Sequence, residues 1–217
     1  MQLVSVLFFY SRVILTQNLE QFLEFADRRI ANGSNAKNGQ FPYFISMRSN
    51  EHKHYCGGFM ITPSWLGSAA HCLEKYPVPF MYIVAGSAII DEGYAERIEK
   101  IFMHPDFESP TLIHDIGLMK TLRPIPENQN TKRIYLGTDI VIGAKAIYSG
   151  YGVFSPKPLM RPRVLQYISS KVIDNETCWK KLGKGWHKNH TICTVTQRYS
   201  GSCQGHFFAV KLFNLLI

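Results

Sequence analysis

The sequence contains no internal repeat and no low-complexity segment, and this absence argues against a disordered chain. Charged residues are scarce, at 18%, beside 46% apolar residues, a balance typical of a globular protein with a buried core. The length of 217 residues suits one domain, or two small halves packed together.

Acidic residues are fewer than basic residues, 16 against 24, and the formal net charge is +8. A basic chain can bind nucleic acid, a membrane surface or an anionic polysaccharide. No run of Lys and Arg in this sequence is longer than two residues. We therefore interpret the charge as a solvated basic surface, and we expect no nucleic-acid or membrane partner.

The apolar stretch at the N-terminus is short. Residues 3–15 include Arg12 and are too few to span a bilayer. Their length fits the hydrophobic region of a secretory signal peptide, although no Lys or Arg precedes them. We predict a signal peptide at 1–17 and a secreted, extracellular protein, with a buried N-terminal element as the alternative. Three N-x-S/T sequons, compatible with secretion but common by chance, stand at Asn32, Asn175 and Asn189.

No two cysteines form a CxxC pair, which argues against a zinc ribbon or a thioredoxin-type motif. The five cysteines instead include two pairs with similar separations, Cys56 with Cys72 and Cys178 with Cys193. As disulfides, each pair would close a loop of roughly 15 residues and stabilise the fold by about 3 kcal/mol. Such bonds need an oxidising compartment. Cys203 is left over.

Short apolar runs separated by Gly, Pro, Asn and Asp follow residue 30. This pattern is typical of many short strands in a β-sandwich or barrel. Helical periodicity is weak along the chain. We expect a helix to begin in the segment 19–29, and a short helix to open at TPSW (62–65). The polar segment 121–137, with two prolines, predicts a linker between two halves. The runs that we predict as strands are 43–47, 58–62, 81–86, 116–120, 144–152 and 164–173.

The segment CGGFMITPSWLGSAAHC, at 56–72, places a histidine beside the second of two cysteines. It resembles the histidine-bearing motif of the chymotrypsin-like (trypsin) serine proteases. Other segments resemble motifs of that family in the same order along the chain, so that the resemblance spans 29–205. They are RIANG (29–33), GQFPY (39–43), HDIGLM (114–119), GYG (150–152) followed by LQ (165–166), and SCQG (202–205).

The resemblance implies an all-β fold of two antiparallel six-stranded barrels, and a lineage that cleaves proteins or peptides by acyl transfer. A serine hydroxyl is a weak nucleophile that needs a base, and an imidazole titrates near neutral pH. By resemblance, His71 is that base and Asp115 is the buried carboxylate that orients it. The alternative is a packed structural histidine and an aspartate in a turn.

The resemblance also implies a zymogen. Another protease would cleave after Arg29 and make Ile30 the new N-terminus, so that 18–29 is a short propeptide and 30–217 the protease domain. His206 stands where the family has the aspartate that binds the freed ammonium group. Burying an ammonium group against an imidazole is unfavourable, and we expect this activation step to fail.

The family pattern breaks at the nucleophile. Phe207 stands where the catalytic serine is expected, and its side chain has no nucleophilic atom. Losing such a nucleophile costs on the order of a millionfold in turnover, so we predict an inactive chain. By resemblance, Gly205 supplies one N–H of the oxyanion hole, and Gly201 corresponds to the base of the specificity pocket. Ser200 and Ser202 would reach the base only through a rebuilt loop.

The sequence ends ten residues after Phe207, whereas the family pattern continues. We therefore expect a second barrel that is truncated at its C-terminus and a Cys203 that stays unpaired. The tail is apolar with one lysine. Its AVKL segment (209–212) either lies against the barrel as a replacement strand or exposes an edge that aggregates.

No cofactor and no metal is implied. His52 with His54, and His187 with His190, are better interpreted as surface-loop histidines than as metal ligands. Two function classes remain. The chain is either a serine endopeptidase homologue that is inactive as written, or a secreted non-catalytic homologue that binds a partner through its barrel surface.

Overall fold

The computed structural model describes most of the chain after residue 32. The predictions for a signal peptide, a propeptide, a helix at 19–29 and cleavage between Arg29 and Ile30 lie outside the described residues. So do Asn32 and the segment 197–208, which carries Gly201, Cys203, Gly205, His206 and Phe207, together with Ser200 and Ser202. The described residues are 33–109, 111–137, 141–152, 155–156, 159–160, 162–182, 192–196, 209–212 and 215–216.

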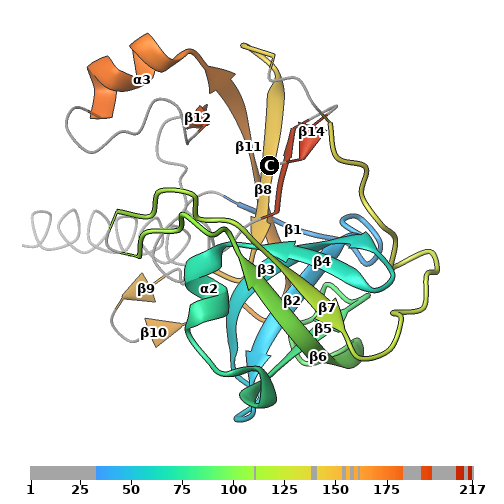
Figure 1. The fold of residues 1–217 in the computed structure, drawn as a ribbon. Coiled ribbons are helices and arrows are strands. Elements are labelled where there is room, and N and C mark those ends of the chain that lie inside the picture. The colour runs from blue at the N-terminus through green and yellow to red at the C-terminus, as the bar shows by residue number, and fades with distance from the viewer. Residues whose placement is uncertain are drawn as a thin grey trace, which may run out of the picture.

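Six antiparallel strands close the first barrel, in the order β2-β3-β4-β7-β6-β5 (Figure 1). In β7, buried and more exposed positions alternate, so that Met119 points into the barrel and Leu118 and Lys120 point out. The strands are β2 (Phe44–Ser49), β3 (His54–Thr62), β4 (Trp65–Ser68), β5 (Met81–Ala85), β6 (Tyr94–Met103) and β7 (Gly117–Thr121).

Apolar side chains fill the interior of this barrel. Ile45, Met60, Leu66, Ile83 and Met119 come from five different strands and are completely buried. Burying a side chain of this size contributes roughly 1.5–3 kcal/mol. This core therefore holds together strands that lie far apart in the sequence.

The prediction of a helix opening at 62–65 is wrong. Thr62 ends β3 and Trp65 begins β4, and a tight turn joins them. The Thr62 hydroxyl accepts hydrogen bonds from the N–H groups of Ser64 and Trp65, at 3.3 and 3.1 Å. A threonine followed by proline suits a helix start and a turn equally well, and the pairing of β3 with β4 selects the turn.

The second half is built on β8 (Lys145–Gly150) and β11 (Gln166–Ile173), which pair antiparallel. The sheet runs β1-β11-β8-β13-β14, and β12 also pairs with β11. The AVKL segment forms β13 against β8, which is one of the two outcomes expected for it. The other strands are β1 (Ser34–Asn35), β12 (Cys193–Thr196), β13 (Ala209–Leu212), β14 (Leu215–Leu216) and the separate ribbon of β9 (Ser155–Pro156) and β10 (Leu159–Met160).

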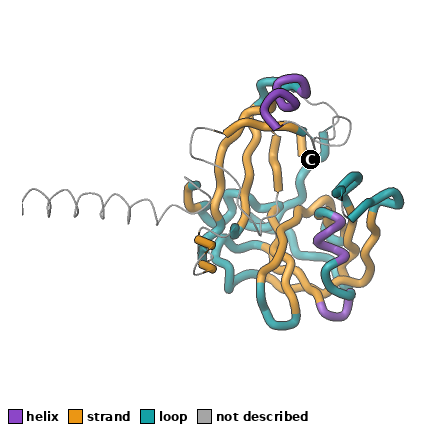
Figure 2. The backbone as a smooth tube through the Cα atoms, turned by 90° about the vertical axis from the view of Figure 1, so that its left-hand side faces the viewer, coloured by secondary structure: helices purple, strands orange, loops and turns teal. Residues whose placement is uncertain are grey.

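The all-β class is thus confirmed, whereas truncation of the second barrel stays a prediction. Figure 2 shows helix only at the margins, with α2 (Ala70–Glu74) beside the first barrel and α3 (Asn175–Leu182) at the outer end of the second sheet. A 3-10 turn, η1 (Val78–Phe80), precedes β5. None of the helices in the described part of the chain is long and apolar enough to cross a membrane.

The two halves meet through a second apolar cluster, which includes Phe41, Phe44, Phe59, Tyr151 and Leu165. The main-chain N–H of Leu165 donates to the carbonyl oxygen of Ala88, which follows β5, across this junction at 2.6 Å. The predicted linker, 121–137, leaves β7 and contains no further named strand or helix. Each half also contains one disulfide, Cys56–Cys72 in the first and Cys178–Cys193 in the second.

Candidate active site

His71 lies in the five-residue helix α2, beside the barrel (Figure 1). The disulfide from Cys72 to Cys56 ties this helix to β3. Ala70 and Leu73 are completely buried on either side of the histidine. The imidazole itself stays 30% exposed, so the helix is anchored by its neighbours while the ring remains accessible.

Asp115 lies two residues before β7, at the end of an irregular turn. Leu112 and His114 in this turn both have φ of +55°. A side chain in this left-handed region is uncommon and costs of order 1–3 kcal/mol. Packing at both ends of the turn must therefore maintain the conformation that precedes Asp115.

The two side chains meet in a double hydrogen bond. His71 Nδ1 lies 2.6 Å from Asp115 Oδ2, and the main-chain N–H of His71 donates to Oδ1 at 2.9 Å. A carboxylate only accepts hydrogen bonds, so Nδ1 carries the proton and Nε2 of the neutral ring holds the lone pair. This arrangement can accept a proton at Nε2 and stabilise the resulting imidazolium.

The approach of β7 to α2 depends on Gly117. A Cβ on Gly117 would lie 2.5 Å from Leu73 Cδ1 and 2.8 Å from the carbonyl oxygen of Phe102. The absence of a side chain therefore lets the strand that follows Asp115 lie against the helix that carries His71. Sequence reasoning assigned no role to this glycine, although the glycine of HDIGLM was the available signal.

A histidine pair supports the same turn. The rings of His104 and His114 stack with centroids 4.4 Å apart and an interplanar angle of 7°. The main-chain N–H of His104 also donates to the carbonyl oxygen of Ile116, at 3.0 Å. These contacts hold the turn on both sides of Asp115, and no pattern in the sequence indicated them.

The interpretation of His54 as a surface-loop histidine is wrong. His54 begins β3 and is only 6% exposed. Its Nδ1 lies 2.8 Å from Ser46 Oγ, to which Arg48 Nε also donates. The ring packs edge-on against Tyr151, with centroids 5.1 Å apart. It thus lies at the junction of the two halves. His52 is exposed, 2.7 Å from the Tyr82 hydroxyl, and His187 and His190 lie outside the described residues.

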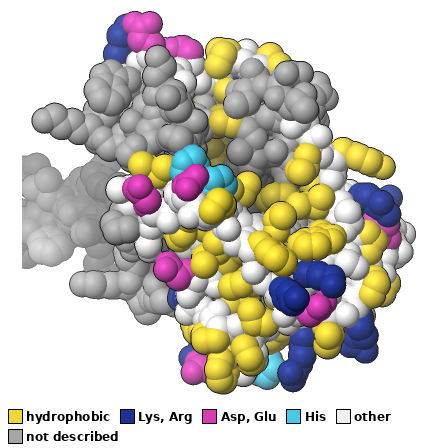
Figure 3. Space-filling model, in the orientation of Figure 1, with side chains coloured by type: hydrophobic (Ala, Val, Ile, Leu, Met, Phe, Trp, Pro, Cys, Tyr) yellow, Lys and Arg dark blue, Asp and Glu magenta, His cyan; other side chains and the backbone are white. Residues whose placement is uncertain are grey.

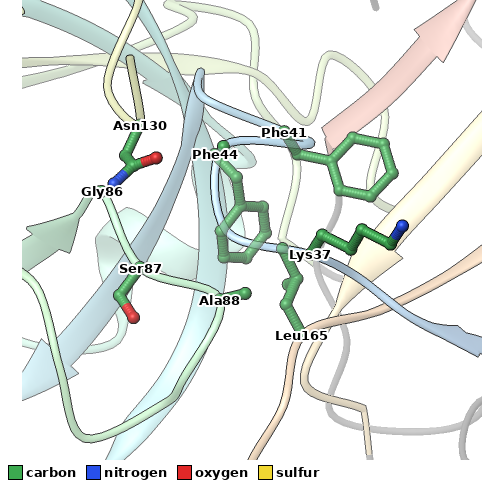
Figure 4. A pocket seen from close by; sticks show the side chains of 9 residues that line it. Lys37, Phe41, Phe44, Gly86, Ser87, Ala88, Asn130 and Leu165 are labelled. Carbon is green, nitrogen blue, oxygen red and sulfur yellow. The ribbon is translucent and has the colours of Figure 1, made fainter. Parts of the chain in front are cut away.

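A small pocket opens near the junction of the two halves (Figure 4). None of its lining residues belongs to α2 or to the turn before β7, so it is not part of the candidate site. Its side chains come from the β1–β2 connection, the first residue of β2, the segment after β5, the linker and the residue before β11, and include Lys37, Phe41, Phe44, Ser87, Asn130 and Leu165.

The structure therefore brings together His71 and Asp115, which are 44 residues apart. It joins Cys56 to Cys72 and Cys178 to Cys193, as the spacing predicted. The remaining predicted site residues lie outside the described residues. Their roles, and the catalytic roles of His71 and Asp115, stay predictions.

The chain belongs to the trypsin family, because the family model named Trypsin matches residues 30–206. It is 29% identical over 185 residues to Transmembrane protease serine 9 of Rattus norvegicus, covering 82% of this chain and 17% of that protein. It is also 29% identical to Trypsin theta of Drosophila melanogaster (69% of this chain, 58% of the relative) and to Chymotrypsin-2 of Vespa crabro (81% and 79%). The chain thus spans less than two thirds of the first two relatives. Trypsin-family proteases act on protein substrates.

Proposed function

We propose that this chain is a serine endopeptidase homologue that retains the general base and its carboxylate but does not turn over peptide bonds. The contrast between two positions carries the proposal. His71 is held by Asp115 with Nε2 ready to accept a proton, while Phe207 stands where the resemblance places the nucleophile. A base can activate only a group that has a proton to give and an atom to attack with, and a phenyl ring has neither.

In an intact relative, the pair would work with a serine hydroxyl. The base takes the hydroxyl proton at Nε2 as oxygen attacks the peptide carbonyl, and then gives it to the leaving amine. The carboxylate stabilises the imidazolium between these steps. Without the hydroxyl no acyl bond forms, and the pair has no proton to move.

The same proposal includes secretion and a zymogen form. Residues 1–17 would be a leader, 18–29 a propeptide, and a second protease would cleave between Arg29 and Ile30. The family match that begins at Ile30 supports this division, and the two disulfides suit an oxidising compartment. Because position 206 is a histidine, we expect cleavage at Arg29 to leave the chain inactive.

A serine-directed phosphonate tests the central claim. The full chain, cleaved after Arg29, should acquire no covalent label. Residual peptide hydrolysis should agree within about twofold between the natural chain and H71A, whereas losing the base of a working triad lowers kcat on the order of a millionfold. H52A, which removes an exposed histidine outside the site, is the matched control. Stoichiometric labelling, or a large loss of hydrolysis in H71A alone, would contradict the proposal.

The second candidate, a non-catalytic binding homologue, is favoured by the outer face of the first barrel. Figure 3 shows apolar side chains gathered there. Phe102 and Leu118 lie opposite each other on β6 and β7 and are 47% and 38% exposed. The Trp65 ring lies 5.7 Å from that of Phe102. Exposed apolar clusters often mark interaction sites. A protein that co-purifies with the unlabelled chain, and is lost in L118E, would support this candidate.

A further inference from the structure

The sequon Asn175–Glu176–Thr177 is a motif to which the proposed function gives no role. Its middle residue is not proline, so it meets the sequence requirement for an N-glycosylation acceptor. The other two sequon asparagines, Asn32 and Asn189, lie outside the described residues. Asn175 is therefore the sequon asparagine whose surroundings in the folded chain are defined.

We propose that Asn175 carries an N-linked oligosaccharide in the secreted chain, an inference that rests on the secretion included in the proposed function. The co-reactant is a lipid diphosphate-linked oligosaccharide of the secretory pathway. The bond that forms joins the side-chain nitrogen Nδ2 to the anomeric carbon of the first sugar. The bond that breaks joins that carbon to the diphosphate, which leaves with the electron pair, while Nδ2 gives up one of its two protons.

Asn175 stands at an edge of the molecule where a sugar has room. It is the first residue of α3, which lies at the outer end of the second sheet (Figure 2). Helical side chains lean toward the N-terminus of their helix, so a first residue has no earlier helical turn beneath its side chain. Asn175 is partly exposed, and its neighbours Asp174 and Glu176 are exposed. An oligosaccharide attached here can extend into solvent without displacing a packed element.

The cap of α3 comes from Asp174 and not from the acceptor asparagine. Asp174 Oδ1 accepts a hydrogen bond from the main-chain N–H of Thr177, and Oδ2 accepts one from the Thr177 hydroxyl, both at 2.8 Å. This is the usual geometry of an aspartate that caps a helix. A glycosidic bond uses one amide proton of Asn175 and leaves the side-chain carbonyl and the second N–H in place. The cap and the sugar are therefore compatible.

The surface around Asn175 is hydrophilic and firmly anchored. Glu176 and Lys180 form an ion pair at 2.7 Å, with side chains that are 78% and 71% exposed, and Figure 3 shows charged side chains at this end of the molecule. Cys178 is completely buried and bonded to Cys193 of β12. The disulfide fixes one side of α3 to the sheet, so that the charged side, next to which a sugar would lie, faces water.

Glycopeptide mapping tests this asparagine separately from the other two. The full chain is expressed in a secretory animal cell line, and the sugar is released enzymatically in heavy-oxygen water, which converts a glycosylated asparagine into a labelled aspartate. After reduction, cleavage after Lys171 and Lys180 gives a peptide that contains Asn175, and cleavage after Lys188 separates Asn189 from it. We expect the label at Asn175 in most copies of this peptide.

Two substitutions should each remove the mass of one oligosaccharide, N175Q at the acceptor and T177A at the third position of the sequon. T177S is the matched control, because it changes the same residue but keeps a hydroxyl that the sequon and Asp174 both require. It should keep the sugar. N175Q should retain the near-ultraviolet circular dichroism of the natural chain, because the cap of α3 is unchanged.

A second chain, in which an established signal peptide precedes residue 18, separates this inference from the proposed secretion. If the natural chain stays in the cytosol without sugar while the redirected chain is modified at Asn175, secretion fails and the glycosylation site stands. An unlabelled Asn175 peptide in most copies of either chain, recovered from the secretory lumen or the medium, would overturn the inference. Equal masses of the secreted natural and N175Q chains would overturn it as well.

Discussion

At the residue scale, the carboxylate of Asp115 controls the candidate site by accepting two hydrogen bonds from the same residue. One comes from the ring of His71 and the other from its main chain. The bond from the ring sets which ring nitrogen is protonated. The bond from the main-chain N–H fixes the position of the His71 backbone relative to the carboxylate. Because Asp115 is only 17% exposed, water competes poorly for these bonds, and the orientation of the imidazole does not depend on a bound substrate.

Replacing Asp115 with alanine should therefore release the ring. The strongly downfield Nδ1–H proton resonance expected of a 2.6 Å hydrogen bond should disappear from the NMR spectrum. The free energy of unfolding should fall by about 3 kcal/mol or more, because two hydrogen bonds to a charged group, each contributing about 1.5–3 kcal/mol, are lost.

D91N is the matched control for D115A. Asp91 pairs with Arg163 at the surface, where their side chains are 64% and 77% exposed, so this variant should change stability by less than about 1 kcal/mol. A downfield resonance that persists in D115A would contradict the assigned role of Asp115.

At the element scale, α2 and β7 approach each other only because one position has no side chain. Gly117 faces Leu73 of the helix and the main chain of Phe102 in β6. The clash at Leu73 involves a flexible side-chain end, but the carbonyl oxygen belongs to a paired strand and cannot move independently. The position of β7, and with it the turn that carries Asp115, is thereby coupled to this glycine.

The substitution G117A should destabilise the chain by about 1–3 kcal/mol through overpacking, and should weaken the Nδ1–H resonance of His71 by displacing Asp115. Denaturant unfolding measures the first effect and NMR the second. G150A is the matched control, since a Cβ there meets nothing within 4 Å. Equal stability of the two variants would show that β7 and α2 have room to separate.

Several elements followed from local pattern and others did not. The runs at 43–47, 81–86 and 116–120 overlap β2, β5 and β7 closely, because their apolar residues are sufficient to indicate a buried strand. No long apolar run indicates β6, because its sequence YAERIEKIFM is mostly exposed and four of its ten residues are charged. Its strand conformation comes from pairing with β5 and β7.

At the scale of the whole molecule, the ionisation of buried tyrosines makes the stability of the fold depend on pH in alkaline solution. Burial raises the pKa of Tyr43, Tyr55 and Tyr151 well above the ordinary value of 10.0. Tyr43 and Tyr151 lie in the cluster that joins the two halves, and Tyr55 lies in the first barrel. The folded state thus keeps all three phenols neutral at pH values where the unfolded chain ionises them.

A group whose pKa is higher in the folded state contributes stability that is complete below its unfolded pKa and is lost above it. We therefore expect stability to fall as the pH rises beyond about 10, with phenolate absorbance and loss of near-ultraviolet circular dichroism appearing together. Y151F removes one of these groups and should show a smaller alkaline loss. Phenolate formation by every tyrosine near pH 10, with the fold intact, would contradict this expectation.

The sequence by itself determined the family, the all-β class, both disulfide pairings and the choice of His71 and Asp115, because all of these follow from residue type, spacing and order along the chain. Only the tertiary structure decided that Nδ1 of His71 carries the proton, that Gly117 admits α2 against β7, that His54 is buried between the halves and that Cys72 Sγ faces Nε2. Each of these features depends on the distance between atoms or on the burial of a side chain, and both are set when segments far apart in the sequence pack against one another.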